Sequence, residues 1–310
     1  MNYPYANGTI KVIEANILDK NKLSKLINLS QNDIIKTLID LGYGNPESKS
    51  IEELIAYEVK STRDLFSQIT PDKFHTNLFY TANDAVNIKF FYKKKIFNVE
   101  SFNIYSDAGT ISKDDLEKAI FKDDFSNLSK PLAKLFININ EEVAKLQNSR
   151  LISAKIDNLI YDFILKQNKN NSLKVYFNTC IDIANIMTFV RSKKLGWASD
   201  EFLDMFVNGG NIPKEAYIKA YDSVDIPRVF MNFYSEKVSY GLKAYLENHD
   251  LNQLEMYFDK LLINIMKEYR YDSFDIGPML YYYLIKEAEA KNIRLLYNNS
   301  NLDLNDLLDY

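Results

Sequence analysis

The chain has 310 residues, of which 46% are hydrophobic and 26% charged, and its formal net charge is -4. This composition is typical of a folded globular protein and excludes extensive disorder. The negative charge, without a concentrated basic face, disfavours a nucleic-acid partner. Only nine glycines and seven prolines are present, too few for turn-rich sandwiches or barrels or for glycine-loop α/β folds, so an all-α fold is expected.

Helical patterns begin near residue 30. Over 30–42, apolar residues recur at three- to four-residue spacing between Ser30, a predicted N-cap, and Gly42, a predicted stop. Ser50 followed by Glu53 has the form of a capping box, which predicts the start of a longer helix that ends near residue 69.

Thr70 before Pro71 predicts another N-cap with proline at the first helical position, and this helix should run to about residue 93. The remaining chain continues the same apolar periodicity, interrupted by glycine and proline. Further helices are predicted over 130–168 (one helix or two), 172–194, 199–207, 213–221, 227–247, 250–268 and 277–294.

One sequence pattern recurs three times at long intervals: an acidic residue, then asparagine three positions later, then isoleucine. The copies are DAVNI, DIANI and EAKNI. A carboxylate and an amide at this spacing lie on one helical face, where they can bond each other or a neighbouring helix, and the asparagine would fix one packing register. The six residues are Asp84 and Asn87, Asp182 and Asn185, and Glu289 and Asn292.

A second landmark follows the first two copies, because GTISKDDLEKA from Gly109 matches GNIPKEAYIKA from Gly210. Intervals near 100 residues exceed the ~20–50 residues of common solenoid repeats. We therefore expect three homologous helical lobes, over 1–110, 111–210 and 211–310. The alternative is chance recurrence in a chain rich in Asn and Ile.

Basic residues follow two of the copies, namely Lys93 and Lys94 after the first and Arg191, Lys193 and Lys194 after the second. Cations near a helix C-terminus complement the helix dipole, which is the simpler explanation. The functional alternative is that these charges face a partner subunit or lipid headgroups, where electrostatic attraction would aid docking.

Catalytic signals are weak. His75 and His249 are far apart and lack the close-spaced partner of a helical zinc site. The acidic pairs lack the spacing that puts magnesium ligands on one helix face, and the single Cys180 lies in an apolar run, typical of a core residue. We predict no catalytic site, metal, cofactor or small-molecule substrate.

Four passages resemble one family. They are YANGTIKVIEANIL near the start, NDIIKTLIDLGYG ending at Gly44, DIANIMTFVRSKKLG through GGNIP in the middle, and LIKEAEAKNIRLLY near the end. In this order they resemble the C subunit of the V-type/A-type rotary ATPases (ATP synthases), whose homologue in eukaryotic vacuolar enzymes is called d. Thr9 departs from the pattern, where arginine would be expected.

The resemblance implies a funnel of three helical lobes around a pseudo-threefold axis. It implies a non-catalytic central-stalk connector that seats the D/F shaft on one side and docks on the c/K proteolipid ring on the other. Such a protein would lie on the cytoplasmic side of the membrane, peripheral through its complex, and would transmit torque for proton or sodium transport or for ATP synthesis.

Two other functions stay open at this point. One is a helical scaffold or adaptor unrelated to rotary ATPases, and the other is a helical metal-dependent enzyme. The N-terminus lacks the layout of a signal peptide and no apolar run is long enough to span a membrane, which predicts an intracellular chain. The large excess of lysine over arginine favours a bacterial source.

Overall fold

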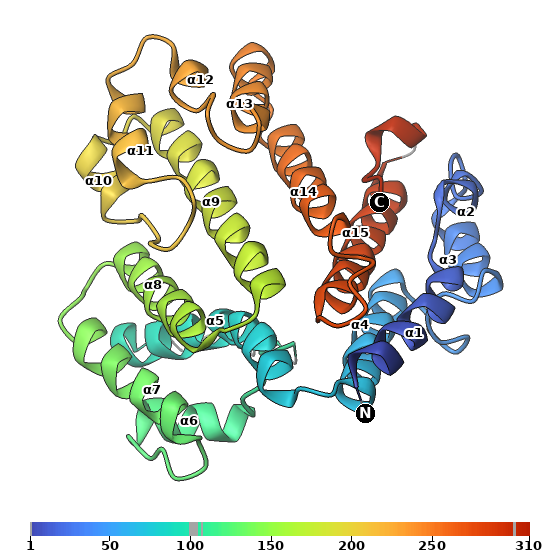
Figure 1. The fold of residues 1–310 in the computed structure, drawn as a ribbon, viewed down its shortest axis with the longest axis horizontal. Helices are drawn as coiled ribbons and strands as arrows, with labels where there is room; N and C mark the ends of the chain where they lie inside the picture. The colour runs from blue at the N-terminus through green and yellow to red at the C-terminus, as the bar shows by residue number, and fades with distance from the viewer. Residues whose placement is uncertain (1, 99–104, 107, 300–301) are drawn as a thin grey trace. The chain divides into compact units, whose positions relative to one another are not determined.

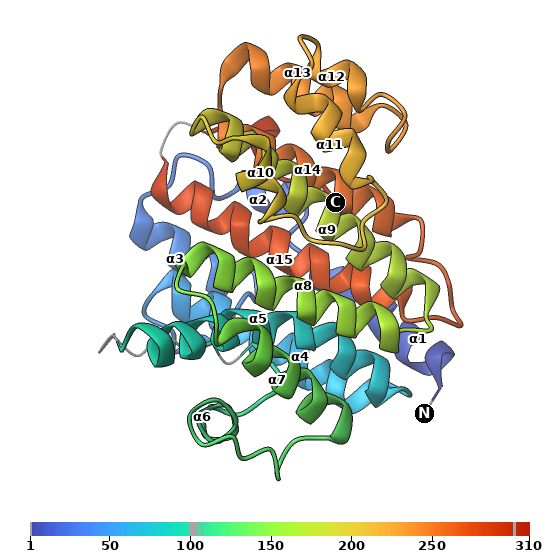
Figure 2. The ribbon, with the colours of Figure 1, turned by 90° about the vertical axis from the view of Figure 1, so that its left-hand side faces the viewer.

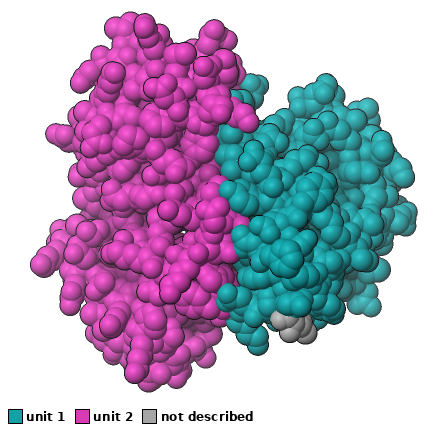
Figure 3. Space-filling model, viewed as in Figure 1, with its two compact units in different colours: residues 1–73, 251–310 teal, residues 74–250 magenta. Residues whose placement is uncertain are grey.

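The computed structural model describes residues 2–98, 105–106, 108–299 and 302–310. Every regular element in these residues is a helix, so the predicted all-α class is confirmed (Figure 1). The chain divides into two compact units, and Figure 3 colours them separately. Unit 1 joins both chain ends, residues 1–73 and 251–310, and unit 2 is the continuous segment 74–250. The division into three lobes stays a prediction.

Unit 1 is built around two long helices, α4 and α15, which pack against each other and which both views place side by side (Figures 1 and 2). Its core includes leucines and isoleucines from the N-terminal helices together with Ile293 and Leu307. The elements of unit 1 are α1 (Tyr3–Ile13), η1 (Glu14–Asn16), α2 (Lys20–Ser24), α3 (Gln31–Asp40), α4 (Ile51–Ile69), α14 (Leu251–Lys267), α15 (Gly277–Asn298) and η2 (Leu304–Asp306).

Unit 2 contains the helices of the continuous segment 74–250. An aromatic core lies toward the C-terminal end of α9, where the Phe189 ring meets Phe202 and Tyr221 edge to face. Aromatic rings in this arrangement stabilise the fold by more than the burial of their surface area alone. The elements of unit 2 are α5 (Lys73–Phe97), α6 (Lys113–Phe121), α7 (Lys130–Val143), α8 (Ser149–Gln167), α9 (Asn171–Lys194), α10 (Ser199–Leu203), α11 (Lys214–Tyr221), α12 (Ile226–Val229) and α13 (Lys237–Asn248).

The predicted caps at the first helices are confirmed in part. The Ser30 hydroxyl accepts the Asp33 N–H at the start of α3, and the Ser50 hydroxyl accepts the Glu53 N–H at the start of α4. The Glu53 carboxylate, however, accepts the N–H of Lys49 rather than that of Ser50, so the capping box closes one residue earlier than predicted.

The N-cap predicted at Thr70 is wrong. Thr70 ends α4 with an extended backbone, which the following proline favours sterically. Its hydroxyl accepts the Asp72 N–H, and α5 begins only at Lys73. The proline therefore separates two helices instead of opening the second.

The helix predicted over 227–247 is broken into α12 and α13. Tyr234, Ser235 and Glu236 between them all have positive φ, between 50° and 67°, a conformation that costs energy for residues other than glycine. The Tyr234 hydroxyl bonds a buried carboxylate of α9 at 2.5 Å. A tertiary contact thus outweighs the helical periodicity of the segment. The helix predicted over 199–207 is shortened to α10.

Candidate functional site

The three repeated motifs form similar hydrogen-bonded arrangements, in which a carboxylate and an amide on a long helix bond the backbone of another part of the chain. We call each one a clamp. The first clamp is Asp84 and Asn87 on α5, the second is Asp182 and Asn185 on α9, and the third is Glu289 and Asn292 on α15. All six side chains are buried.

In every clamp the asparagine amide pairs with both backbone groups of one residue. Asn87 bonds the N–H and C=O of Ser106, both at 2.8 Å. Asn185 does the same with Val207, at 2.9 and 2.8 Å. Asn292 does so with Leu308, at 2.8 and 2.9 Å. Because a buried amide must find donors and acceptors, this two-point contact fixes the position of the bonded segment on its helix.

The carboxylates of the first two clamps hold a second point of the same segment. Asp84 accepts the N–H groups of Thr110 and Ile111 at 2.7 and 3.1 Å, and the Thr110 hydroxyl at 2.6 Å. Asp182 accepts the N–H groups of Asn211 and Ile212 at 2.7 and 3.0 Å. Two N–H groups aimed at one carboxylate make charge-assisted bonds, which are stronger than neutral ones.

Glycine is required beside each of these carboxylates. A Cβ added to Gly109 would overlap Asp84 Oδ1, and a Cβ added to Gly210 would overlap Asp182 Oδ1. The second sequence landmark thus has a structural cause, since the glycines let the backbone approach the carboxylate closely enough to bond it.

The third clamp differs in its partners and joins both ends of the chain. Glu289 accepts the Leu18 N–H at 2.6 Å and pairs with the Lys286 ammonium at 2.5 Å. Lys286 also contacts the Glu58 carboxylate of α4 at 2.6 Å. Since Asn292 holds the C-terminal segment at Leu308, the clamp ties α15 to three other parts of unit 1.

Burial and the neighbouring charges shift the pKa values of Glu289 and Lys286. Burial raises the pKa of Glu289, although Lys286 and the Leu18 N–H favour its charged form. Burial by itself disfavours charged Lys286, but the Glu289 and Glu58 carboxylates outweigh it and raise the pKa of that ammonium. One cation therefore serves two carboxylates, so removing it leaves an uncompensated buried charge.

The basic residues predicted for docking differ in their surroundings. On α5, Lys93 and Lys94 are half-buried. Lys89 beside them pairs with Asp157 at 2.8 Å, and burial together with Lys89 lowers the pKa of Lys93. On α9, by contrast, the predicted cations are exposed, and they are Arg191, Lys193 and Lys194.

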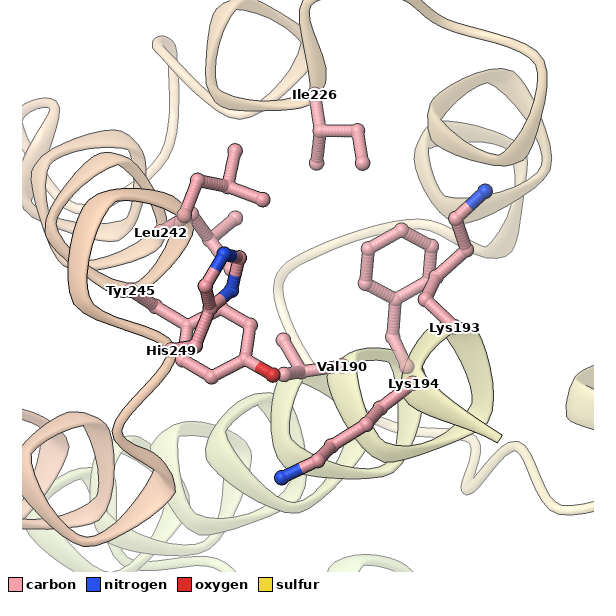
Figure 4. A pocket seen from close by; sticks show the side chains of 9 residues that line it. Val190, Lys193, Lys194, Ile226, Leu242, Tyr245 and His249 are labelled. Atoms are coloured by element: carbon pink, nitrogen blue, oxygen red, sulfur yellow. The ribbon is translucent and has the colours of Figure 1, made fainter. Parts of the chain in front are cut away.

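Two of the exposed lysines border an apolar cavity of about 250 Å³ in unit 2 (Figure 4). On one side stand Val190, Lys193 and Lys194 of α9, and on the other stand side chains of α13. The Lys193 ammonium bonds the Tyr221 carbonyl at 3.2 Å and lies over that tyrosine's ring. The lining residues are Phe189, Val190, Lys193, Lys194, Ile226, Leu242, Tyr245, Leu246 and His249.

Sequence reasoning missed the α13 wall of this cavity. Leu242, Tyr245 and Leu246 recur at helical spacing, but that pattern is equally typical of a core face. His249 ends α13 in the left-handed region with φ 56° and meets the Tyr245 ring edge to face. His75 lies on another helix, α5, and does not line this cavity.

The described residues offer neither a metal cluster nor a helix suited to a bilayer. Where the structure describes the chain, no three His, Cys, Asp or Glu side chains gather closely enough to hold a metal ion. None of the helices in that part of the chain combines the length and the apolar content that crossing a bilayer requires.

Comparison with known proteins places the chain in a family. The family model described as ATP synthase (C/AC39) subunit matches residues 6–304. The A-type ATP synthase C subunit of Thermococcus onnurineus is 22% identical, over 95% of this chain and 85% of that protein. Its counterpart in Desulfurococcus sp. is 24% identical over the same shares, and that of Archaeoglobus fulgidus 21% over 95% and 91%. The resemblance seen in the sequence is confirmed, and the chain belongs to the ATP synthase (C/AC39) subunit family.

Proposed function

We propose that the chain is the non-catalytic central connector of a V/A-type rotary ATPase, where it couples a D/F shaft to a c/K proteolipid ring. In this role it transmits torque for ion transport or ATP synthesis and attaches peripherally, on the cytoplasmic side, through its complex. Family membership supports this role over an unrelated scaffold or a metal-dependent enzyme.

The observation that carries the proposal is the threefold recurrence of the clamp. A connector under torque needs helices and loops that do not slip against one another. The first two clamps each fix one loop to a long helix by more than three hydrogen bonds. The third fixes two segments to α15, with two bonds at Leu308 and one at Leu18. Burial in a low-dielectric interior strengthens such bonds. We propose that the three clamps mark three homologous lobes arranged as a funnel with pseudo-threefold symmetry.

The proposal assigns docking to the basic helix ends. Lys93, Lys94, Arg191, Lys193 and Lys194 would face a partner subunit, and complementary charge would set the orientation and the rate of docking. The exposed residues on α9 fit this role better than the half-buried lysines on α5, because a partner can reach an exposed charge directly.

The test is reconstitution. The purified chain is mixed with the detergent-solubilised ring and the D/F shaft of its own organism, and comigration of all three is measured by gel filtration. Arg191→Glu should weaken assembly about tenfold or less, as expected for a rim charge. Lys174→Glu, an exposed site near the other end of α9, is the control. Failure of the wild-type chain to comigrate with verified partners would refute the connector role.

A further inference from the structure

We infer that the cavity between α9 and α13 receives an apolar side chain of an acidic helical segment of a partner protein. The inference deepens the proposed function, because it states the chemistry by which unit 2 would grip a partner. It rests on the shape of the cavity, on the sign of its rim charge and on the directions of its two ammonium groups.

The cavity walls are apolar and well ordered by their own packing. Phe189, Val190 and Leu242 are each 4% exposed or less. At about 250 Å³ the cavity lies below the ~300–1,000 Å³ of small-molecule sites. It suits one or two apolar side chains, as in the anchor pockets where helices dock.

One exposed apolar side chain lines the cavity, and two more lie close to lining residues in the sequence. Leu246, which lines it, is 42% exposed, and Leu195, next to Lys194 in the chain, is 64% exposed. Val224, two residues before the lining residue Ile226, is fully exposed. An exposed apolar side chain at the opening of an apolar cavity is typical of an interaction surface.

The charged side chains at the rim of the cavity are both positive. Among the described residues that line the cavity, two are lysines and none carries a carboxylate. In Figure 4 the Lys193 and Lys194 ammonium groups point away from the apolar walls, toward different sides of the opening. Carboxylates one helical turn before and after an apolar anchor match two ammonium groups that point to different sides of the opening. This arrangement favours an acidic amphipathic helix over an anionic lipid.

The direct test uses a defined probe. A fluorescein-labelled helical peptide with a central Phe, and Glu one turn away on either side, is titrated with the full-length chain and followed by anisotropy. Two companion peptides replace the Phe by Ala or both Glu by Lys. We expect saturable binding of the first peptide, and binding at least about tenfold weaker for each companion, which corresponds to one lost anchor.

Matched variants locate the binding. Leu246→Glu and the double variant Lys193→Glu/Lys194→Glu should each weaken binding about tenfold. Their controls are Ile137→Glu on α7, a side chain that is also 42% exposed, and Lys174→Glu on α9. Circular dichroism of each variant checks the fold, which these exposed substitutions should leave intact.

The outcomes separate the inference from the proposed function. No binding of the Phe peptide, or binding equally strong in the cavity variants and in the controls, overturns the inference. So does binding of phosphatidylglycerol vesicles, but not of the peptide, through the same residues. If the cavity variants assemble normally with the ring and the D/F shaft while losing the peptide, the inference stands for a partner other than these proteins and the connector role is untouched.

Discussion

Replacing Lys286 by methionine should destabilise unit 1 severely. The lysine side chain is 8% exposed and contacts Glu58 and Glu289 at 2.6 and 2.5 Å, and Glu289 is fully buried. Methionine fills a similar volume but leaves two carboxylates facing each other without a cation. Removing one partner of a buried ion pair costs about 3–5 kcal/mol, which lowers the melting temperature on the order of 10 °C.

The same helix supplies the control for this substitution. Lys291 pairs with Asp259 at 2.6 Å but is 42% exposed, so Lys291→Met should cost about 1 kcal/mol or less. Adding Glu58→Gln and Glu289→Gln to Lys286→Met should recover most of the loss, because both carboxylate charges are removed.

Urea unfolding followed by circular dichroism measures these differences. The single tryptophan, Trp197, lies in unit 2, so its fluorescence reports that unit separately. Equal losses of stability in Lys286→Met and Lys291→Met would refute the assignment of Lys286 as the shared buried cation.

Three further predictions concern the clamps. Asn185→Leu leaves two buried backbone groups unpaired and should lower the unfolding free energy by about 2–4 kcal/mol. Asn138→Leu on the exposed face of α7 is the control and should change it by less than about 0.5 kcal/mol. Similar losses for the two variants in urea unfolding would contradict the role of Asn185 in the clamp. Gly210→Ala forces a Cβ onto the Asp182 carboxylate and should destabilise the fold by about 1–3 kcal/mol. Gly8→Ala within α1, where the Cβ meets open space, should stabilise it by about 0.5–1 kcal/mol. Thermal melts that shift in the same direction for both variants would refute the requirement for glycine at 210. Because burial raises the pKa of Glu289, its contribution to stability is full below the ordinary value of about 4.5 and is lost as the pH rises through the folded-state pKa. Glu289→Gln should therefore lose less stability than the wild type as the pH rises above about 4.5, and an unchanged pH profile of urea midpoints would count against that assignment.

The repeat was visible in the sequence because its chemistry is local. An acid and an amide three residues apart on a long apolar helix can be recognised from their spacing alone, and the glycines at 109 and 210 mark the second landmark. Helix α9 illustrates the same point, since its predicted range of 172–194 agrees with Asn171–Lys194. Local capping and periodicity carry enough information to place such an element.

The bonded partners were not visible because they depend on the tertiary fold. The predicted partner was wrong, because the amides bond non-helical backbone rather than the carboxylate of their own motif or a neighbouring helix. Nothing near Lys286 in the sequence indicates Glu58, which lies 228 positions away, and nothing near Glu289 indicates the Leu18 N–H. The acid and the asparagine have the same spacing in all three copies. In the third copy, however, the acid bonds a lysine and the N-terminal segment, whereas in the first two it bonds the loop that carries the glycine.

The break between α12 and α13 has the same origin. Residues 234–236 follow a helical pattern, but the hydroxyl of Tyr234 is held by Asp182, so the backbone adopts a conformation that its own sequence disfavours. Local strain of this kind persists only where the surrounding contacts over-determine it. The second clamp thus organises more than the loop it bonds, because it also sets where α13 begins. The α13 wall of the cavity therefore depends on Asp182, a carboxylate that lies 52 residues before Tyr234 in the chain.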